Sequence, residues 1–255
     1  MTLKVHRPYV VAESKHGDEK LVWLGLDEAD AEKGILANQY LYIAEDKALL
    51  IDPGGYFVFQ RVYQAVSEFV DPRKVVGIFY SHQDPDVAGS LNLILEFFPR
   101  AKVYVSEIWT RFLPHLGVES GVEYEGIPDK GREIIIEGKR LLAIPAHFLH
   151  SPGNFNLYIP GLKALFTGDI GAVVFPPGIW YLFVEDFDEH VRYMEWFHKR
   201  FMACQRALEA WLSKVKKLDI EVIAPQHGAI FTGENARRFL KWLESLGEVG
   251  AELLG

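Results

Sequence analysis

Cysteine is almost absent from this sequence. Cys204 is the single cysteine in 255 residues, so no disulfide can form within the chain. A chain without disulfides is typical of a reducing compartment, and we expect the cytoplasm. The first twenty residues contain no apolar stretch of signal-peptide length. The longest uncharged stretch, residues 170–184, is interrupted by two prolines and is too short to span a bilayer. These absences predict a cytoplasmic protein without a membrane segment.

Positive charge is also scarce. The chain has 27 Lys and Arg against 35 Asp and Glu, a formal net charge of −8. A nucleic-acid-binding protein needs a positive field to replace the counterions of phosphate, so we expect no nucleic-acid partner. The hydrophobic and charged fractions, 49% and 24%, are those of an ordinary globular protein. No linker or low-complexity segment divides the chain, which predicts one domain over residues 1–255.

Short β-rich runs and helical patterns alternate along the chain. The predicted strands are 21–25, 38–44, 47–52, 74–80, 101–106, 133–138, 140–146, 155–160, 163–169 and 221–225. The predicted helices are 56–70, 87–98, one long amphipathic helix over 191–218 and a closing helix over 239–246, capped by Gly247. Each half therefore supplies several strands and then helices. This order predicts an α+β protein, a four-layer αββα sandwich.

Residue types that commonly bind metals, His and Asp, follow four of these predicted strands. They are His82, Asp84 and Asp86 after 74–80, His147 and His150 after 140–146, Asp169 at the end of 163–169, and His227 after 221–225. A single Asp or His at a strand end is more often a turn or cap residue than a ligand. Together, however, three of these His and the three carboxylates, on one edge of a sandwich, could hold two metal ions. One carboxylate could bridge ions spaced about 3.5–4 Å apart.

This layout resembles the metallo-β-lactamase superfamily, whose signature is H-x-H-x-D-H, then His, Asp and His. The matching residues are His82-x-Asp84-x-Asp86-Val87, His150, Asp169 and His227. The run LLIDPGG, residues 49–55, is similar to the early strand and turn of that superfamily, with Asp52 in a supporting role. The second His of the signature is Asp84 here. A carboxylate at that place resembles the diiron domain of flavodiiron proteins and the stand-alone oxygen-binding diiron proteins.

The resemblance to flavodiiron proteins extends to FLHSPGN at 148–154, ALFTGD at 164–169 and IAPQHGAIF at 223–231. It implies that one metal takes His82, Asp84 and His150, that the other takes Asp86 and His227, and that Asp169 bridges them. Replacing imidazole by carboxylate favours Fe or Mn over Zn. We expect two Fe ions, with Mn or Zn as alternatives, and no flavin in this chain. Val87 cannot bind a metal, so the second metal has either an open position or weak occupancy.

The resemblance implies a non-haem diiron protein that binds O2 or NO. Reduction of either gas would need electrons from a separate donor protein, because flavodiiron proteins draw theirs from a flavodoxin domain that follows this one, whereas this sequence stops at Gly255. A sensor that passes the signal to another protein would use the same site. A metal-dependent hydrolase of ester, thioester or phosphodiester bonds is the alternative. The flavodiiron analogy also suggests a homodimer.

Several other residues have two interpretations each. His147 could support His150 or be merely exposed, and the aromatic run 170–183 could cover the metals or fill the core. Asn38 is interpreted as structural, and Cys204 as a core-facing packing residue on the long helix. We expect the polar residues His198, Lys199, Arg200, Arg206 and Lys214 to form the solvated face of that helix.

Overall fold

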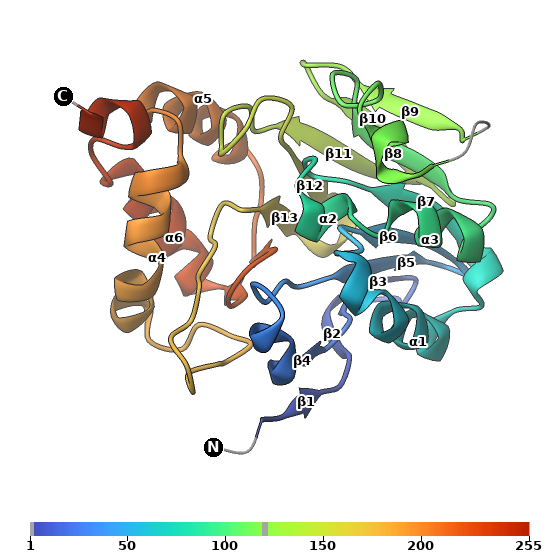
Figure 1. Cartoon of the computed structure of the whole chain (residues 1–255). Helices are drawn as coiled ribbons and strands as arrows, with labels where there is room; N and C mark the ends of the chain where they lie inside the picture. The colour runs from blue at the N-terminus through green and yellow to red at the C-terminus, as the bar shows by residue number, and fades with distance from the viewer. Residues whose placement is uncertain (1–2, 119–121, 255) are drawn as a thin grey trace.

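Two mixed β-sheets form the centre of the structure, a computed structural model that describes residues 3–118 and 122–254 (Figure 1). The first sheet has the order β2 (Tyr9–Glu13), β3 (Glu19–Trp23), β5 (Tyr40–Ala44), β6 (Lys47–Ile51), β7 (Val75–Phe79), β8 (Lys102–Ser106) and β9 (Tyr124–Ile127). The second has the order β10 (Arg132–Ile136), β11 (Lys139–Pro145), β12 (Phe155–Ile159), β13 (Ala164–Gly168), β14 (Val222–Pro225) and β15 (Phe231–Thr232). A short ribbon, β1 (Val5–His6) with β4 (Leu26–Asp27), lies beside them.

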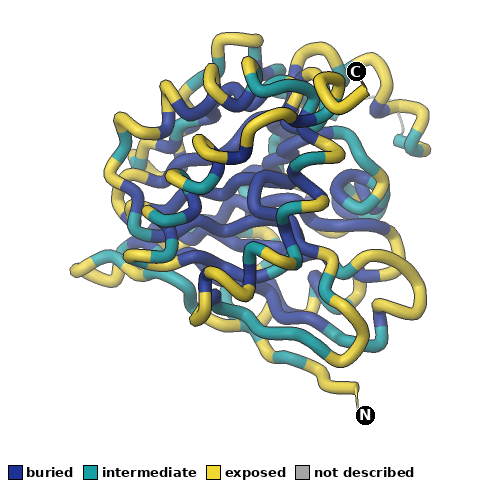
Figure 2. Tube along the Cα trace, turned by 90° about the vertical axis from the view of Figure 1, so that its left-hand side faces the viewer, coloured by how far each residue is buried: buried dark blue, intermediate teal, exposed yellow. Residues whose placement is uncertain are grey.

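Alternation along the strands creates the core between the two sheets. On β5, Tyr40 and Tyr42 face this core, while Leu41 points to the opposite side of the sheet. On β12, Phe155 and Leu157 face the same core from the second sheet. All of these side chains are buried, and Figure 2 shows the buried strands inside a mostly exposed outer chain.

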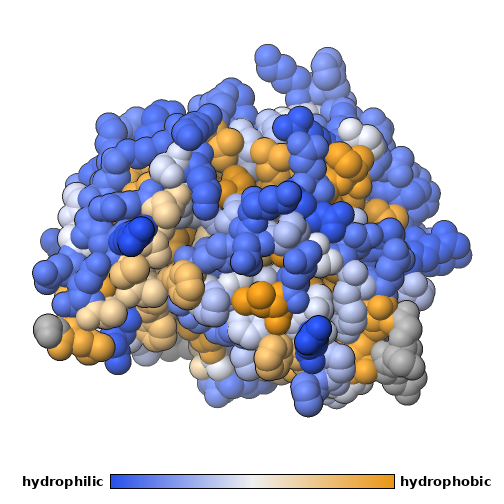
Figure 3. Space-filling view, turned by 90° about the horizontal axis from the view of Figure 1, so that it is seen from above, coloured by the Kyte–Doolittle hydropathy of each residue, from blue (hydrophilic) through white to orange (hydrophobic). Residues whose placement is uncertain are grey.

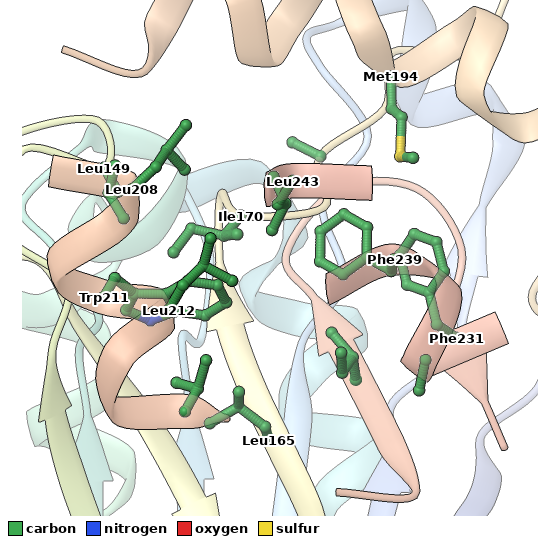
Figure 4. Packing of buried hydrophobic residues seen from close by; sticks show 14 of the residues in the cluster. Leu149, Leu165, Ile170, Met194, Leu208, Trp211, Leu212, Phe231, Phe239 and Leu243 are labelled. Carbon is green, nitrogen blue, oxygen red and sulfur yellow. The ribbon is translucent and has the colours of Figure 1, made fainter. Parts of the chain in front are cut away.

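Helices cover the outer face of each sheet. The helices α1 (Phe59–Phe69), α2 (Pro85–Ala88) and α3 (Leu91–Phe97) pack on the first sheet. The helices α4 (Phe187–Phe201), α5 (Gln205–Val215) and α6 (Glu234–Glu244) pack on the second. Figure 4 shows Trp211 of α5 and Phe239 of α6 among the buried hydrophobic side chains of this layer. The predicted α+β fold, a four-layer αββα sandwich, is confirmed.

The expectation of one long helix over 191–218 is wrong. The chain leaves α4 at Met202, which is extended, and re-enters a helix after Cys204. Between them the Ala203 amide donates to the Phe148 carbonyl, and the Ala203 carbonyl accepts from Ala251. Both helices bury one face on the same sheet, so the apolar spacing continues across the break and hides it. Cys204 caps α5 and is only half-buried, so its assignment to a core-facing helical position is also wrong.

Other boundaries differ for similar local reasons. The predicted helix over 87–98 is divided at Gly89 and Ser90, because Ser90 donates both its amide and its hydroxyl to the Gly54 carbonyl. The closing helix begins at Glu234 and ends at Glu244, with Ser245 rather than Gly247 as its C-cap. Strands β2, β9 and β15 and the β1–β4 ribbon were not predicted. No helix in the described parts of the chain is both long and apolar enough to cross a membrane. The face seen in Figure 3 is largely hydrophilic, with separate hydrophobic groups.

The helix α4 buries two histidines, contrary to the expectation that His198 is solvated. His198 donates from Nδ1 to the Met194 carbonyl, and its Nε2 accepts from the Gly171 amide at 2.9 Å. His190 forms a 2.8 Å hydrogen bond with the Tyr181 hydroxyl. Burial lowers the pKa of each imidazole from 6.5 to about 4. Both are therefore neutral in the folded protein at pH 7.

We predict that replacing His190 by leucine makes the stability of the apoprotein less dependent on pH. The folded-state pKa is depressed, so the stabilisation is complete above pH 6.5 and is lost as pH falls towards 4. The loss is on the order of 3 kcal/mol for one such group. Urea unfolding at pH 7 and pH 4.5 measures it. An equal pH dependence in the wild type and His190→Leu would contradict the prediction.

Candidate metal centre

The six predicted ligand residues lie together where the two sheets meet at one edge. His82 follows β7, His150 follows β11, Asp169 follows β13 and His227 follows β14. Asp84 is the N-cap of α2, and Asp86 lies in the first turn of that helix. The backbone of Asp84 is extended, whereas Asp86 is already helical. The turn into α2 still brings Asp86 to the same place.

Asp169 stands at the centre of the cluster. Its Oδ2 is 2.9 Å from His150 Nε2 and 3.8 Å from His82 Nε2, whereas its Oδ1 is 3.6 Å from His227 Nε2. The two oxygens of one carboxylate therefore face two different groups of imidazoles. This is the geometry that a bridging carboxylate needs.

Each of the other two carboxylates lies on one side of Asp169. Asp84 Oδ2 is 3.3 Å from His150 Nε2 and 3.7 Å from His82 Nε2. Asp86 Oδ2 is 3.0 Å from His227 Nε2. Donor atoms of His82, His150 and Asp169 all lie within 4.8 Å of one another, close enough for one ion. On the other side, Val87 is fully buried among the apolar side chains of the first sheet.

The polar atoms of the cluster are not satisfied by protein partners alone. His82 Nε2 and Asp169 Oδ1 are buried and have no hydrogen-bond partner among the described residues. Burying such atoms without a partner costs about 1–3 kcal/mol each. A cation between the imidazoles and carboxylates would give both atoms a partner. The donor set, three imidazoles and three carboxylates, fits iron or manganese.

Charges within the cluster shift its pKa values strongly. Burial lowers the pKa of His150, but hydrogen bonds to Asp169 and Asp84 outweigh burial and raise it to about 10. Burial also lowers the pKa of His227, but the hydrogen bond to Asp86 and the nearby carboxylates outweigh burial and raise this pKa to about 9. Burial raises the pKa of Asp169, yet the three nearby imidazoles hold it well below its usual range. The Asp169 carboxylate is therefore ionised and attracts positive charge.

Hydrogen bonds behind the cluster orient two of the imidazoles. Ser81 donates its amide and hydroxyl to the buried Asp52, and the Ser81 hydroxyl bonds His82 Nδ1 at 2.8 Å. His227 donates from Nδ1 to the Leu36 carbonyl at 2.7 Å. Each contact leaves the Nε2 atom facing the cluster. Asp52 has a φ of 43°, a left-handed conformation rare outside glycine and often found at functional sites.

Asn38 ties the two sheets together beside His227. Its side-chain oxygen accepts from Trp23 Nε1, and its Nδ2 donates to the carbonyls of Pro225 and Gly228. These carbonyls flank the His227 loop. Asn38 is therefore structural, as expected, and it also fixes the loop that carries His227.

Contacts of His147 show its role, and contacts of the run 170–183 show where part of that run packs. His147 donates from Nε2 to the Asp129 carbonyl and accepts at Nδ1 from the Gly153 amide, so it holds its own loop. In the run 170–183, Trp180 stacks on Trp23. The same run lines a cavity of about 1040 Å³, which reaches Asn38 and Gly228. Sequence reasoning missed Ser81 and Gln83, whose side chains contact the predicted ligand residues His82 and Asp84. Their positions beside His82 were the available signal.

Comparison with known proteins identifies the family. A family model described as ODP family beta lactamase matches residues 35–228. The chain therefore belongs to the ODP family of proteins with the β-lactamase fold. The chemotaxis sensor ODP from T. denticola is 38% identical, with a TM-score of 0.83, and the match covers 99% of this chain and 98% of that one. A peroxy diiron species of the chemotaxis sensor ODP gives a TM-score of 0.85 at 38% identity, over 97% and 98% of the two chains.

Flavodiiron proteins are more distant relatives. The flavo-diiron protein FprA2 of Clostridium acetobutylicum is 27% identical over 80% of this chain and 51% of its own length. An uncharacterised Methanocaldococcus jannaschii protein is 26% identical over 91% of this chain and 61% of its own length. The chain thus spans between half and two thirds of the length of these two relatives. The flavodiiron protein of Giardia intestinalis shares the fold, with a TM-score of 0.78 and 17% identity, over 93% and 59% of the two chains.

We predict that Asn38→Ala destabilises the protein by about 1–3 kcal/mol, because Trp23 Nε1 and two carbonyls lose a buried partner. Asn92→Ala, at an exposed position of α3, is the matched control and should stay within about 0.5 kcal/mol of wild type. Denaturant unfolding of both variants measures the difference. Equal stabilities would show that Asn38 does not hold the sheets together.

Proposed function

We propose that residues 1–255 form one metallo-β-lactamase-like diiron domain that binds O2 or NO. The observation that carries the proposal is Asp169, whose two oxygens face two imidazole groups, with Asp84 and Asp86 on opposite sides. One position would use His82, Asp84 and His150, and the other Asp86 and His227, with Asp169 shared. Two ferrous ions held there would supply the electrons that activate a bound diatomic gas.

The residues of this chain hold the ions and keep the site open on one side. The Asp84 and Asp86 side chains are 31% and 29% exposed, so a gas molecule can reach the cluster from solvent. The second position lacks a protein ligand at Val87, which leaves room there for an exogenous ligand. The 38% identity to the chemotaxis sensor ODP over nearly the whole chain supports an oxygen-sensing role. Asp84, in place of an imidazole, favours iron over the zinc of a hydrolase.

The proposal includes partners and a location. Because complete reduction of O2 takes four electrons and two ferrous ions supply two, turnover would need a separate electron-donor protein. A signalling partner would serve instead if the protein is a sensor. We also propose a homodimer by analogy with flavodiiron proteins, and a cytoplasmic location because a chain with one cysteine suits a reducing compartment.

We predict that Asp169→Ala loses more iron than Asp84→Ala. A bridging carboxylate holds both ions and offsets their mutual repulsion, whereas Asp84 contacts only one side. After gel filtration, Asp84→Ala should keep roughly half of the wild-type iron and Asp169→Ala almost none. Asp129→Ala, which removes an exposed carboxylate outside the cluster, is the control. Comparable iron loss in the first two variants would show that Asp169 does not bridge.

We predict that the reduced, iron-loaded protein consumes O2 once and then stops. The two ferrous ions are spent in a single reaction, and Cys204 alone cannot form a dithiol that would reduce them again. Oxygen uptake in a closed cell, after the chemical reductant has been removed, should reach about one O2 per two irons. Uptake far beyond that ratio would contradict the single reaction. No uptake, together with rapid cleavage of a thioester or phosphodiester, would favour the hydrolase.

A further inference from the structure

Gln226 lies between the end of β14 and His227, and its side chain contacts Asp86. The residue is fully buried. Its Nε2 donates to Asp86 Oδ2 at 3.2 Å and approaches the Asp86 carbonyl at 3.4 Å. This amide is the only side chain outside the six ligand residues found in hydrogen-bond contact with Asp86 among the described residues.

The backbone around Gln226 is held on both sides. Its amide donates to the Gly168 carbonyl at 2.8 Å, one residue before Asp169. Its carbonyl accepts from the amide of Asn38, the residue that joins the two sheets. The side chain therefore projects from a rigid support, and its contact with Asp86 has a fixed direction.

The orientation of the amide follows from its neighbours. With the amide reversed, Gln226 Oε1 would meet the Asp86 carboxylate and carbonyl, which are both acceptors. The N–H group therefore faces Asp86. In this orientation Oε1 is buried and has no partner among the described residues, an arrangement that costs free energy in the isolated chain.

The second metal position has the greater need for this support. Val87 supplies no ligand there, so Asp86, His227 and one oxygen of Asp169 are the available protein donors. The Asp86 side chain is 29% exposed and could otherwise rotate towards solvent. We propose that Gln226 is a positioning residue that holds Asp86 towards the second metal and makes occupancy of that position possible. This inference rests on the diiron function proposed above.

The first metal position has a matching glutamine, which provides a control. Gln83 Nε2 donates to Asp84 Oδ1 at 2.9 Å, and Gln83 Oε1 accepts from the Ser151 hydroxyl at 3.1 Å. Thus Gln83 donates a hydrogen bond to Asp84, and Gln226 donates one to Asp86. Removing one amide should affect the metal on its own side and spare the other.

The experiment is an anaerobic Fe(II) titration by equilibrium dialysis of the full chain, wild type, Gln226→Met and Gln83→Met. Methionine keeps the size of the buried side chain and removes the N–H donor. Support of this kind is worth about 10–100-fold in metal affinity. In Gln226→Met we expect the dissociation constant of the second Fe(II) to rise by that factor, while the first stays within about threefold of wild type. Gln83→Met should weaken the first Fe(II) step instead.

The possible outcomes distinguish the proposed role of Gln226 from the proposed diiron function. If the wild type binds two Fe(II) and Gln226→Met also binds both with wild-type affinity, Gln226 does not position Asp86. Equal weakening of both steps would also overturn the proposal, because a general loss of structure affects both metals. If Gln226→Met fails to fold, Gln226→Asn, whose amide is too short to reach Asp86, takes its place with the same expectation. A wild type that never binds two Fe(II) would refute the diiron function instead.

Discussion

The buried carboxylate of Asp169 is the constraint on which the rest of the site depends. It is 5% exposed, ionised, and within 4 Å of three imidazole Nε2 atoms that come from three different loops. A charge in such a place is tolerated only when several partners surround it. The two sheets must therefore pack so that the ends of β7, β11, β13 and β14 lie close together at one edge.

A second layer of hydrogen bonds keeps this arrangement in place. Asp52 and Ser81 orient His82, the Leu36 carbonyl orients His227, and Asn38 joins the strand that precedes His227 to the first sheet. Burial raises the pKa of Asp52 to about 8, even though Ser81 donates to it twice. The loops that carry His82 and His227 are thus held by hydrogen bonds on the side of each imidazole that faces away from the cluster.

Much of this site could be predicted because its residues lie directly after strands that the sequence shows. His82, His150, Asp169 and His227 each follow an apolar strand, and strands that form one sandwich edge bring such residues together. The αββα layering was predictable for the same reason, since strand and helix periodicities are short. The break between α4 and α5 at Met202 could not be predicted, because each helix buries one face on the same sheet. The apolar spacing therefore continues across the break. The burial of His198 was missed because tertiary packing brings the Gly171 amide, which donates to its Nε2, against α4.

Anomalous scattering at the iron edge, from crystals of protein loaded anaerobically with Fe(II), would test the account most directly. The account predicts two iron peaks about 3.5–4 Å apart, one between His82, Asp84 and His150 and the other between Asp86 and His227, with Asp169 touching both. A single peak, or two peaks that do not share Asp169, would contradict it.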